Sequence, residues 1–390
     1  MKRQVCRLVA VVFVLGLFMA TTNAHAMEKT VGEALSNIHF GGLIEVGAAW
    51  QDVEYEDGST EDASDLCLTT LELGAEAEVN DWVSVAVLFL YEDATSFEGE
   101  NDETSVDLDV ATVTIGNTEE YPFYVTAGKM YAPFGALLTH FPDDPLIDQP
   151  LTLLMGETLE KAVLVGGECP LGFKASAYVF NGDMDEEGKE NQIESYGVDV
   201  NYSYNDEQGF DLMVGASYIS NVAESDGLEE ALGEEENLAE ILELEDYDAE
   251  HDQIGLKDYV AGVAAYLHLG YERFFCDVEY MEALDDFEFT GVVDGEAAAY
   301  DSGRAPSVWN VELGYNLDWG KNLEIVLKYA GSDDSKALGF PEKRYGLCLN
   351  QEIFDDVVVS LAYLNDDYES DLAGDLDKRD VVFGQIAIEF

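Results

Sequence analysis

Apolar and polar residues alternate along most of this 390-residue chain, with the period of two that is typical of β-strands. The stretch LELGAEAEV at 71–79 has Leu, Ala or Val at every odd position and the acids Glu72, Glu76 and Glu78 between them. The same alternation recurs in SYGVDVNYSY at 195–204 and in WNVELGYNLDW at 309–319. Counting such segments predicts sixteen strands, at 38–51, 65–79, 82–94, 104–116, 121–130, 158–168, 171–181, 191–205, 209–221, 256–269, 271–284, 305–318, 322–331, 340–353, 356–367 and 378–390.

The connections between these segments alternate in length. Seven are short turns, and between them lie eight long loops at 52–64, 95–103, 131–157, 182–190, 222–255, 285–304, 332–339 and 368–377. Outer-membrane barrels have short periplasmic turns, long outer loops and an even number of strands, and closure leaves no open sheet edge. The pattern predicts an all-β, up-and-down transmembrane antiparallel β-barrel of about 16 strands. A large soluble, secreted β-protein is the alternative.

The third long loop is unusual in composition. The stretch GKMYAPFGALLTHFPDDPLIDQPL at 128–151 holds four of the eight prolines of the chain and is half apolar. Apolar residues would let the loop pack against an inner wall, and prolines would fix its path. We therefore expect loop 131–157 to fold inward and constrict the pore, with an ordinary external loop as the alternative. The candidate constriction and substrate residues are Lys129, Tyr131, Phe134, His140, Asp143, Asp144 and Asp148, of which the three aspartates are expected to face the water.

The longest loop, 222–255, combines many acids with apolar residues at roughly helical spacing. These apolar residues are Leu228, Leu232, Leu238, Ile241, Leu242 and Leu244. The spacing allows a short helix over the outer mouth of the barrel. A solvated acidic tether is an equally good interpretation.

The first residues have the features of a secretory signal peptide. Lys2, Arg3 and Arg7 precede an apolar run at 8–20, and Ala24-His25-Ala26 fits a cleavage site. A membrane-spanning helix needs about 20 apolar residues, which is longer than this run. The sequence predicts a signal peptide at 1–26 with cleavage near Ala26, a short segment at 27–37 and a barrel at 38–390.

The chain is strongly acidic, with 82 Asp and Glu against 18 Lys and Arg and a net charge of −64. Removing residues 1–26 takes away three cations and no acids, which gives −67. Such a charge excludes nucleic acid as a partner. Alternation places these residues on the wall of the lumen: Glu72, Glu76, Glu78, Asp199, Glu312, Asp318 and Arg344. A further set of cations either forms a basic track or pairs with lumen carboxylates: Lys129, Lys161, Lys174, Lys328, Lys343 and Arg344.

Residue types that carry other chemistry are sparse. Cys67, Cys169, Cys276 and Cys348 are far apart and have no histidine at ligand spacing, so we expect no zinc site, although a disulfide stays open. The sequence has no G-x-S-x-G motif and no His/Ser/Asp cluster. We therefore expect no cofactor, no metal and no enzymatic activity.

Several stretches of the chain resemble siderophore porins of the legiobactin-receptor (LbtU-like) type. They include AGKMYAPFGALLTHFPDDPLIDQPLTLLMGET at 127–158, LGFPEKRYGLCLNQEIF at 338–354 and the ending FGQIAIEF. The resemblance covers nearly the whole mature chain. It implies an outer-membrane β-barrel that passes a ferric siderophore into the periplasm, and it implies no particular binding residues. Only about a dozen residues precede the first predicted strand, so we expect no plug domain and no dependence on TonB.

Three functions therefore remain open. The first is a porin for ferric siderophore, constricted by loop 131–157. The second is a general diffusion porin that prefers cations because its lumen wall is acidic. The third is a structural or surface-binding barrel, whose acidic loops attach through divalent cations to lipopolysaccharide or to a partner. In each case we expect a Gram-negative outer-membrane protein that contacts lipid and lipopolysaccharide, with a homotrimer as a possible assembly.

Overall fold

The computed structural model describes residues 37–92, 106–137, 148–182, 184, 193–206, 208–233, 253–293, 296–301, 305–335, 339–368 and 376–390. The chain divides into two compact units, Met1–His39 and Phe40–Phe390. Only residues 37–39 of the first unit are described. The second unit contains the elements discussed below.

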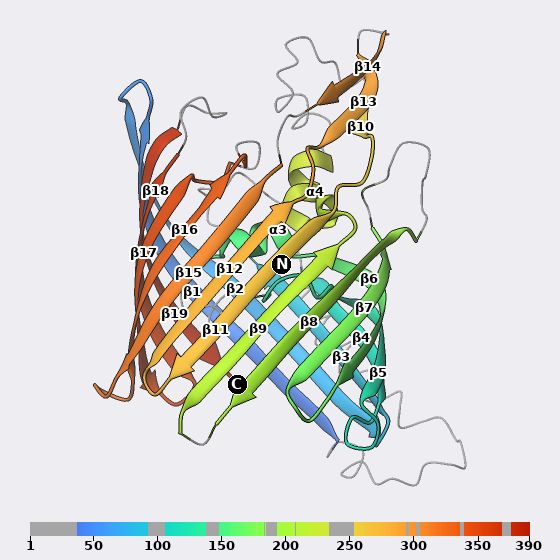
Figure 1. The fold of residues 1–390 in the computed structure, drawn as a ribbon. Coiled ribbons are helices and arrows are strands. Elements are labelled where there is room, and N and C mark those ends of the chain that lie inside the picture. The colour runs from blue at the N-terminus through green and yellow to red at the C-terminus, as the bar shows by residue number, and fades with distance from the viewer. Residues whose placement is uncertain are drawn as a thin grey trace, which may run out of the picture. The chain divides into compact units, whose positions relative to one another are not determined.

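Sixteen strands form a closed antiparallel barrel, in which each strand pairs with its neighbours along the barrel order and β19 closes onto β1 (Figure 1). Every strand predicted from the alternation is confirmed, with ends that differ by a few residues at most positions. The strands are β1 (Ile38–Tyr55), β2 (Thr60–Asn80), β3 (Val83–Glu92), β4 (Asp107–Gly116), β5 (Phe123–Tyr131), β6 (Leu159–Glu168), β7 (Phe173–Asn181), β8 (Ser195–Asn205), β9 (Phe210–Ile219), β11 (Gly262–Tyr271), β12 (Phe274–Ala283), β15 (Ser307–Leu317), β16 (Leu323–Asp333), β17 (Lys343–Phe354), β18 (Val357–Asp367) and β19 (Leu376–Glu389).

Parts of the predicted long loops are regular structure instead. Most of 52–64 extends the β1–β2 hairpin, because paired backbone can continue into water where acids are tolerated on both faces. A small separate sheet also forms from β10 (Gln253–Leu256), β13 (Glu288–Val293) and β14 (Glu296–Asp301). These strands have four to six residues, which is too short for alternation to identify them reliably.

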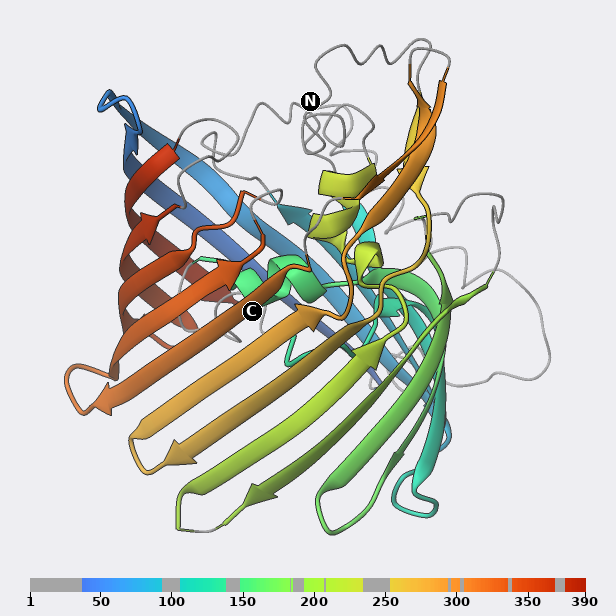
Figure 2. The same cartoon turned by 45° about the horizontal axis from the view of Figure 1, so that its top comes forward.

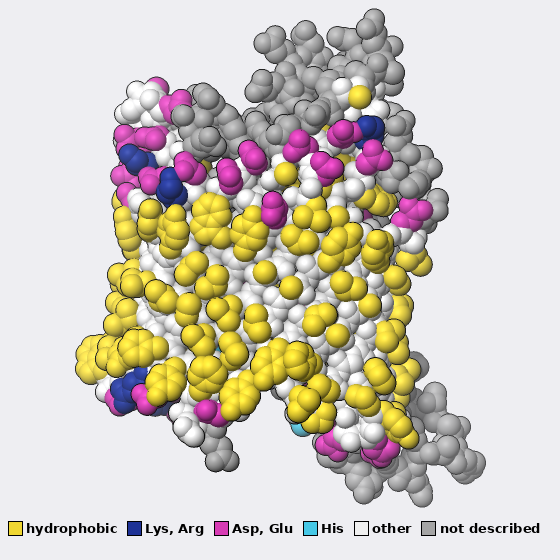
Figure 3. All heavy atoms as spheres, viewed as in Figure 1, with side chains coloured by type: hydrophobic (Ala, Val, Ile, Leu, Met, Phe, Trp, Pro, Cys, Tyr) yellow, Lys and Arg dark blue, Asp and Glu magenta, His cyan; other side chains and the backbone are white. Residues whose placement is uncertain are grey.

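The outer surface of the barrel has an apolar band with aromatic residues at both of its edges (Figure 3). Ring pairs stabilise the edges, with centroids 4.7 Å apart for Phe173–Tyr202, 4.4 Å for Phe274–Tyr315 and 5.3 Å for Tyr329–Tyr345. Acidic side chains lie beyond the upper edge of the band in Figure 3. Lipid-facing barrel surfaces have this pattern of an apolar band between aromatic girdles. Among the described residues, no helix has both the length and the apolar character needed to cross a membrane.

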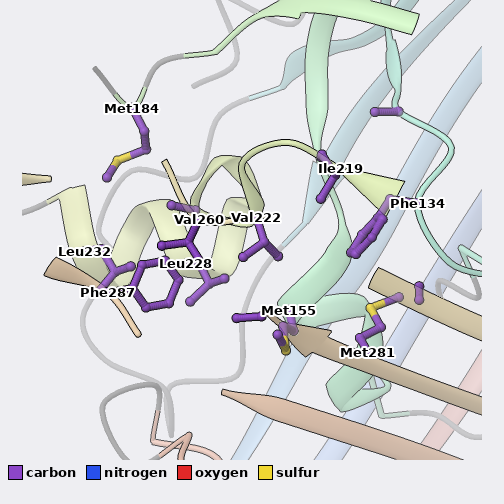
Figure 4. Packing of buried hydrophobic residues seen from close by; sticks show 14 of the residues in the cluster. Phe134, Met155, Met184, Ile219, Val222, Leu228, Leu232, Val260, Met281 and Phe287 are labelled. Atoms are coloured by element: carbon purple, nitrogen blue, oxygen red, sulfur yellow. The ribbon is translucent and has the colours of Figure 1, made fainter. Parts of the chain in front are cut away.

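The main buried cluster lies on the inner side of the barrel wall. It joins Phe134 and Met155 of the third loop to Ile219 of β9 and Met281 of β12 (Figure 4). Three short helices contribute to this region: α3 (Leu151–Gly156), the 3-10 helix η1 (Val222–Glu224) and α4 (Asp226–Gly233). Figure 2 shows α3, drawn in green, within the ring of strands.

Helix α4 confirms the helical interpretation of the start of loop 222–255. Its Leu228 and Leu232 are buried in the same cluster as the third loop. Leu238, Ile241, Leu242 and Leu244 lie outside the described residues. No disulfide joins any two of Cys67, Cys169, Cys276 and Cys348.

Candidate functional site: the pore constriction

The third loop leaves β5 at Tyr131 and returns to the wall at Leu159, where β6 begins. Its two described parts, 132–137 and 148–158, lie on the inner side of the barrel. Tyr178 of β7 donates a hydrogen bond to the Pro133 carbonyl over 3.3 Å, and the Gly135 amide donates to Ser217 Oγ of β9 over 3.1 Å. The loop therefore follows the inner wall as soon as it leaves β5.

One carboxylate of β12 holds two separate parts of the loop. Glu279 is 2 % exposed; its Oε1 accepts a hydrogen bond from the Ala136 amide at 2.5 Å, and its Oε2 accepts one from Thr152 Oγ1 at 2.6 Å. Glu279 thus fastens the outgoing limb and α3 to the same point of the wall.

Apolar packing supports this attachment. Phe134 and Met155 have no exposed surface, and Met281 next to Glu279 is 1 % exposed. A Cβ at Gly156 would come within 2.5 Å of Met281 Sδ, so the missing side chain at this position lets α3 lie close to β12. Figure 4 shows Phe134, Met155 and Met281 close together at the wall.

A second attachment is ionic. Asp148 Oδ2 lies 3.0 Å from Lys328 Nζ of β16 and 3.0 Å from Arg344 Nη1 of β17. Lys328 also pairs with Glu312 of β15 at 3.3 Å. Arg344 makes a two-point contact with Asp366 of β18 at 2.8 and 3.1 Å, and Arg379 of β19 joins the same carboxylate at 2.9 Å.

Together the attachments reach from β7 to β17, and α3 also contacts β12, β15, β16 and α4. The described parts of the loop, fixed at these points, therefore lie inside the barrel. The predicted inward fold is confirmed, and the alternative of an ordinary external loop is wrong.

The structure assigns different positions to several predicted constriction residues. Phe134 is fully buried against the wall, so it anchors the loop and does not face the pore. Asp148 contacts wall cations and not open water, because Lys328 and Arg344 lie within hydrogen-bond distance. Tyr131 donates its hydroxyl to Asp109 of β4 over 2.9 Å. His140, Asp143 and Asp144 lie outside the described residues.

Lys129 was expected at the constriction but falls on the outer side of the barrel. It lies on the same face of β5 as the exposed Phe123 and Val125, and the inward positions between them end at the buried Met130. Its Nζ donates a hydrogen bond to the Leu108 carbonyl of β4 over 3.0 Å.

The predicted wall acids divide into several groups. Glu72, Glu76 and Glu78 alternate with the outward Leu73 and Val79, so they face the lumen. Asp199 is buried on the inner wall, where Ser217, Tyr266 and Asn201 each donate to it at 2.9 Å. Glu312 is buried beside Lys328, and Asn310 donates to it at 2.8 Å.

Asp318 was predicted as a wall residue, and this is wrong. It lies just after β15 ends, with a side chain that is 81 % exposed and paired with Arg273 in a neighbouring short turn. Arg344 does face the lumen, as predicted, but it is 6 % exposed and its guanidinium is occupied by Asp148 and Asp366.

The wall cations are paired with carboxylates and do not form a basic track. Lys328 and Arg344 bind the carboxylates described above, and Lys174 lies 3.6 Å from Glu168. Lys343 shares the outward face of β17 with the exposed Tyr345 and Leu347, and it pairs with Glu342. Lys161 lies on the same face of β6 as the exposed Val163 and Val165 and therefore points outward, like Lys129. The alternative of pairing is the correct one for the cations that face the lumen.

Sequence reasoning missed the residues that hold the loop. Glu279, Asp366 and Arg379 were not singled out, although each occupies an inward position of a predicted strand. Alternation identified the correct face of these strands. It gave no information on which inward residues meet the loop.

The lumen wall also has a recess of about 320 Å³ near the short-turn end, along β16 to β19. Its charged lining residues are all acids: Glu324, Glu352, Asp356 and Glu389. With Glu72, Glu76 and Glu78, they make the open surface of the lumen attractive to cations. No group of three or more His, Cys, Asp or Glu within the described ranges is placed to hold a metal ion.

Burial shifts the pKa of two acids in the long loops: Glu157, which follows α3, and Glu224 of η1. Burial, with a smaller contribution from Asp226, raises the pKa of Glu157 from 4.5 to about 8. Burial likewise raises the pKa of Glu224 from 4.5 to about 7, although Asn221 and the Met184 amide donate hydrogen bonds to its carboxylate. Both groups therefore carry less negative charge near neutral pH than surface acids do.

Comparisons with known proteins agree with the fold. No protein-family model matches the chain. A UPF0422 protein of Coxiella burnetii is 25% identical over 298 residues, which cover 76% of this chain and 57% of that protein. A UPF0422 protein of Legionella pneumophila is 24% identical over 314 residues, covering 79% of this chain and 55% of the relative. The chain thus spans little more than half the length of these relatives.

The similar solved structures are porins. OmpF of Salmonella typhi, solved with daunomycin, has a TM-score of 0.57 at 12% identity and covers 90% of this chain and 97% of its own. An anion-selective porin from Comamonas acidovorans has a TM-score of 0.54 at 11% identity, covering 90% and 99%. At these identities the likeness shows the fold. The chain is therefore similar to UPF0422 proteins in sequence and has the closed sixteen-stranded barrel of porins.

Proposed function

We propose that this protein is an outer-membrane porin, a channel for small solutes rather than an enzyme, whose lumen is constricted by loop 131–157. The observation that carries the proposal is the attachment of the third loop inside the barrel by Glu279 and Asp148. A barrel that only served as a membrane anchor would not need a loop fixed at this depth. Fixed, preformed constrictions select solutes by size and charge.

The apolar band and its aromatic girdles support an outer-membrane location. Helix α4, the small sheet and the strand ends that the long loops connect lie at one end of the barrel and the short turns at the other (Figure 1), so we place the short turns on the periplasmic side. A homotrimer is compatible with this arrangement and is the assembly that we propose.

The finer proposal is that the solute is a ferric siderophore, which passes by diffusion without TonB. This proposal rests on the resemblance to siderophore porins, because no described residue identifies a chelate. The acidic lumen favours chelates with little negative charge.

A general porin that prefers cations is the second candidate. The inward Glu72, Glu76 and Glu78 and the acidic recess near the short turns favour it directly. This candidate requires no specific solute site.

Single-channel recording of the refolded protein in a planar bilayer tests both candidates. We expect step conductance with a reversal potential that shows K⁺ passing more readily than Cl⁻. Block by micromolar ferric chelate, tested with one hydroxamate and one carboxylate complex, would support the siderophore proposal. Conductance that no chelate changes would leave the general porin. Absence of any conductance would contradict both and favour a structural or surface-binding barrel.

A further inference from the structure

Asp148 closes a small ionic network on the inner wall. The wall itself contributes three cations, Lys328, Arg344 and Arg379, and two carboxylates, Glu312 and Asp366. Without the loop these five groups would carry a net charge of +1. The carboxylate of Asp148 neutralises this excess in a lumen that is otherwise acidic.

The two cations that Asp148 contacts are held in place by the wall. Arg344 makes a two-point contact with Asp366, and Lys328 pairs with Glu312, so both cations are held by groups of the wall and not only by the loop. The side chain of Lys328 is 0% exposed and that of Arg344 is 7% exposed. The pair is therefore a preorganised site for an anionic group, and preorganisation strengthens binding.

Asp148 binds this site through only one of its two carboxylate oxygens. Both cations converge on Oδ2, while Oδ1 is buried and has no hydrogen-bond partner among the residues that the structure describes. Asp366, by comparison, offers both of its oxygens to Arg344. A carboxylate that reached the site with both oxygens engaged would bind better than Asp148, because two-point contacts with arginine are the stronger arrangement.

We propose that Lys328 and Arg344 form a binding site for a carboxylate group of the transported solute, and that Asp148 occupies this site as an internal competitor. A solute carboxylate that displaces Asp148 frees the part of the third loop that follows the constriction. The inference rests on the proposed porin function. It supplies one route by which an acidic channel can admit a solute that carries carboxylates.

Citrate is the probe, and current block of the reconstituted channel is the measurement. Asp148→Asn keeps the size of the side chain and removes its charge. We expect it to lower the citrate concentration for half-block by at least about tenfold, since an internal competitor reduces the apparent affinity by the fraction of sites that it occupies. Arg344→Met in the Asp148→Asn background should abolish the gain, and Asp366 would still be paired with Arg379.

Thr152→Val is the control variant. It shows whether loosening the loop, without freeing the two cations, is enough to strengthen citrate block. It removes the contact with Glu279 and leaves Asp148 on its cations. Equal citrate block in wild type and Asp148→Asn would overturn the inference, and so would an equal gain in Thr152→Val.

Calorimetric titration of the detergent-solubilised full chain with citrate separates this inference from the proposed function. If the wild type forms no channel, the porin proposal fails, while stronger citrate binding by Asp148→Asn would still support the site. If the channel conducts but citrate binds neither protein, the site is wrong and the porin proposal stands.

Discussion

Single carboxylates determine where the third loop lies. Glu279 belongs to the wall and accepts hydrogen bonds from two parts of the loop. Asp148 belongs to the loop and pairs with two cations of the wall. Both are close to fully buried, where an unpaired charge is expensive. These residues are therefore more sensitive to substitution than the many exposed acids of the chain.

Glu157 follows α3 directly. Substituting it tests how burial of an acid affects stability, while the contacts of Glu279 and Asp148 stay intact. The folded pKa of Glu157, about 8, lies above the ordinary 4.5, because burial disfavours the ionised form. The folded state thus binds the proton more tightly, so this group makes folding less favourable as pH rises from 4.5 through about 8. We expect Glu157→Gln to raise the urea midpoint at pH 9 and to leave it unchanged at pH 5.

The exposed Glu119, in the turn before β5, is the matched control. Glu119→Gln should not alter the difference in urea midpoint between pH 5 and pH 9. A Glu157→Gln protein with the same pH dependence as wild type would show that Glu157 lies in water.

The third loop depends on close approach as much as on charge. Gly135 has φ of +82°, and a Cβ there would meet Met281 Cε at 2.1 Å and Glu279 Oε1 at 2.5 Å. Alanine would therefore add crowding to an unfavourable backbone conformation. The crowding falls on the side chain whose carboxylate holds the outgoing limb, so we expect this limb to shift relative to Glu279.

We expect Gly135→Ala to change single-channel conductance and to lower stability by about 1–3 kcal/mol, the usual range for a strained backbone position combined with crowding. Gly58→Ala is the matched control, since Gly58 has a similar φ of +78° in the β1–β2 turn and a Cβ there would meet no atom within 4 Å. Gly58→Ala should show the backbone penalty alone, with conductance unchanged. Equal effects of the two changes would argue against contact between Gly135 and the wall.

The barrel strands were predictable because one face meets an apolar surrounding and the other meets water, which imposes a strict period of two. The attachments of the loop were not predictable. Thr152 and Glu279 are 127 residues apart, and Asp148 and Arg344 are 196 apart. Alternation placed Glu279 and Arg344 on the inner face, but the closure of the barrel decides which inward residues lie opposite the loop. The small sheet was missed because its strands are too short to show a period.

For the molecule as a whole, the aromatic girdles predict how it sits in a bilayer. Trp50, Trp82 and Trp319 are exposed, and Trp82 and Trp319 lie in the short turns after β2 and β15. We expect bromines placed high on lipid chains to quench tryptophan fluorescence more strongly than bromines near the bilayer centre, because aromatic girdles lie at the interfaces. Phe replacement of Trp82 and Trp319 assigns the signal to the short-turn edge. Fluorescence that no brominated lipid quenches would exclude the proposed membrane position.

Closure of the barrel also has a consequence for its assembly. The last strand pairs with the first, and the Gln385 amide donates to Glu45 across 340 residues of sequence. Contacts between such distant segments form slowly, because a very long stretch of chain must be brought together first. Until β19 arrives, β1 has an unpaired edge that could join another chain. The high negative charge of the protein opposes such association, so the acids that shape the lumen also keep newly made chains apart.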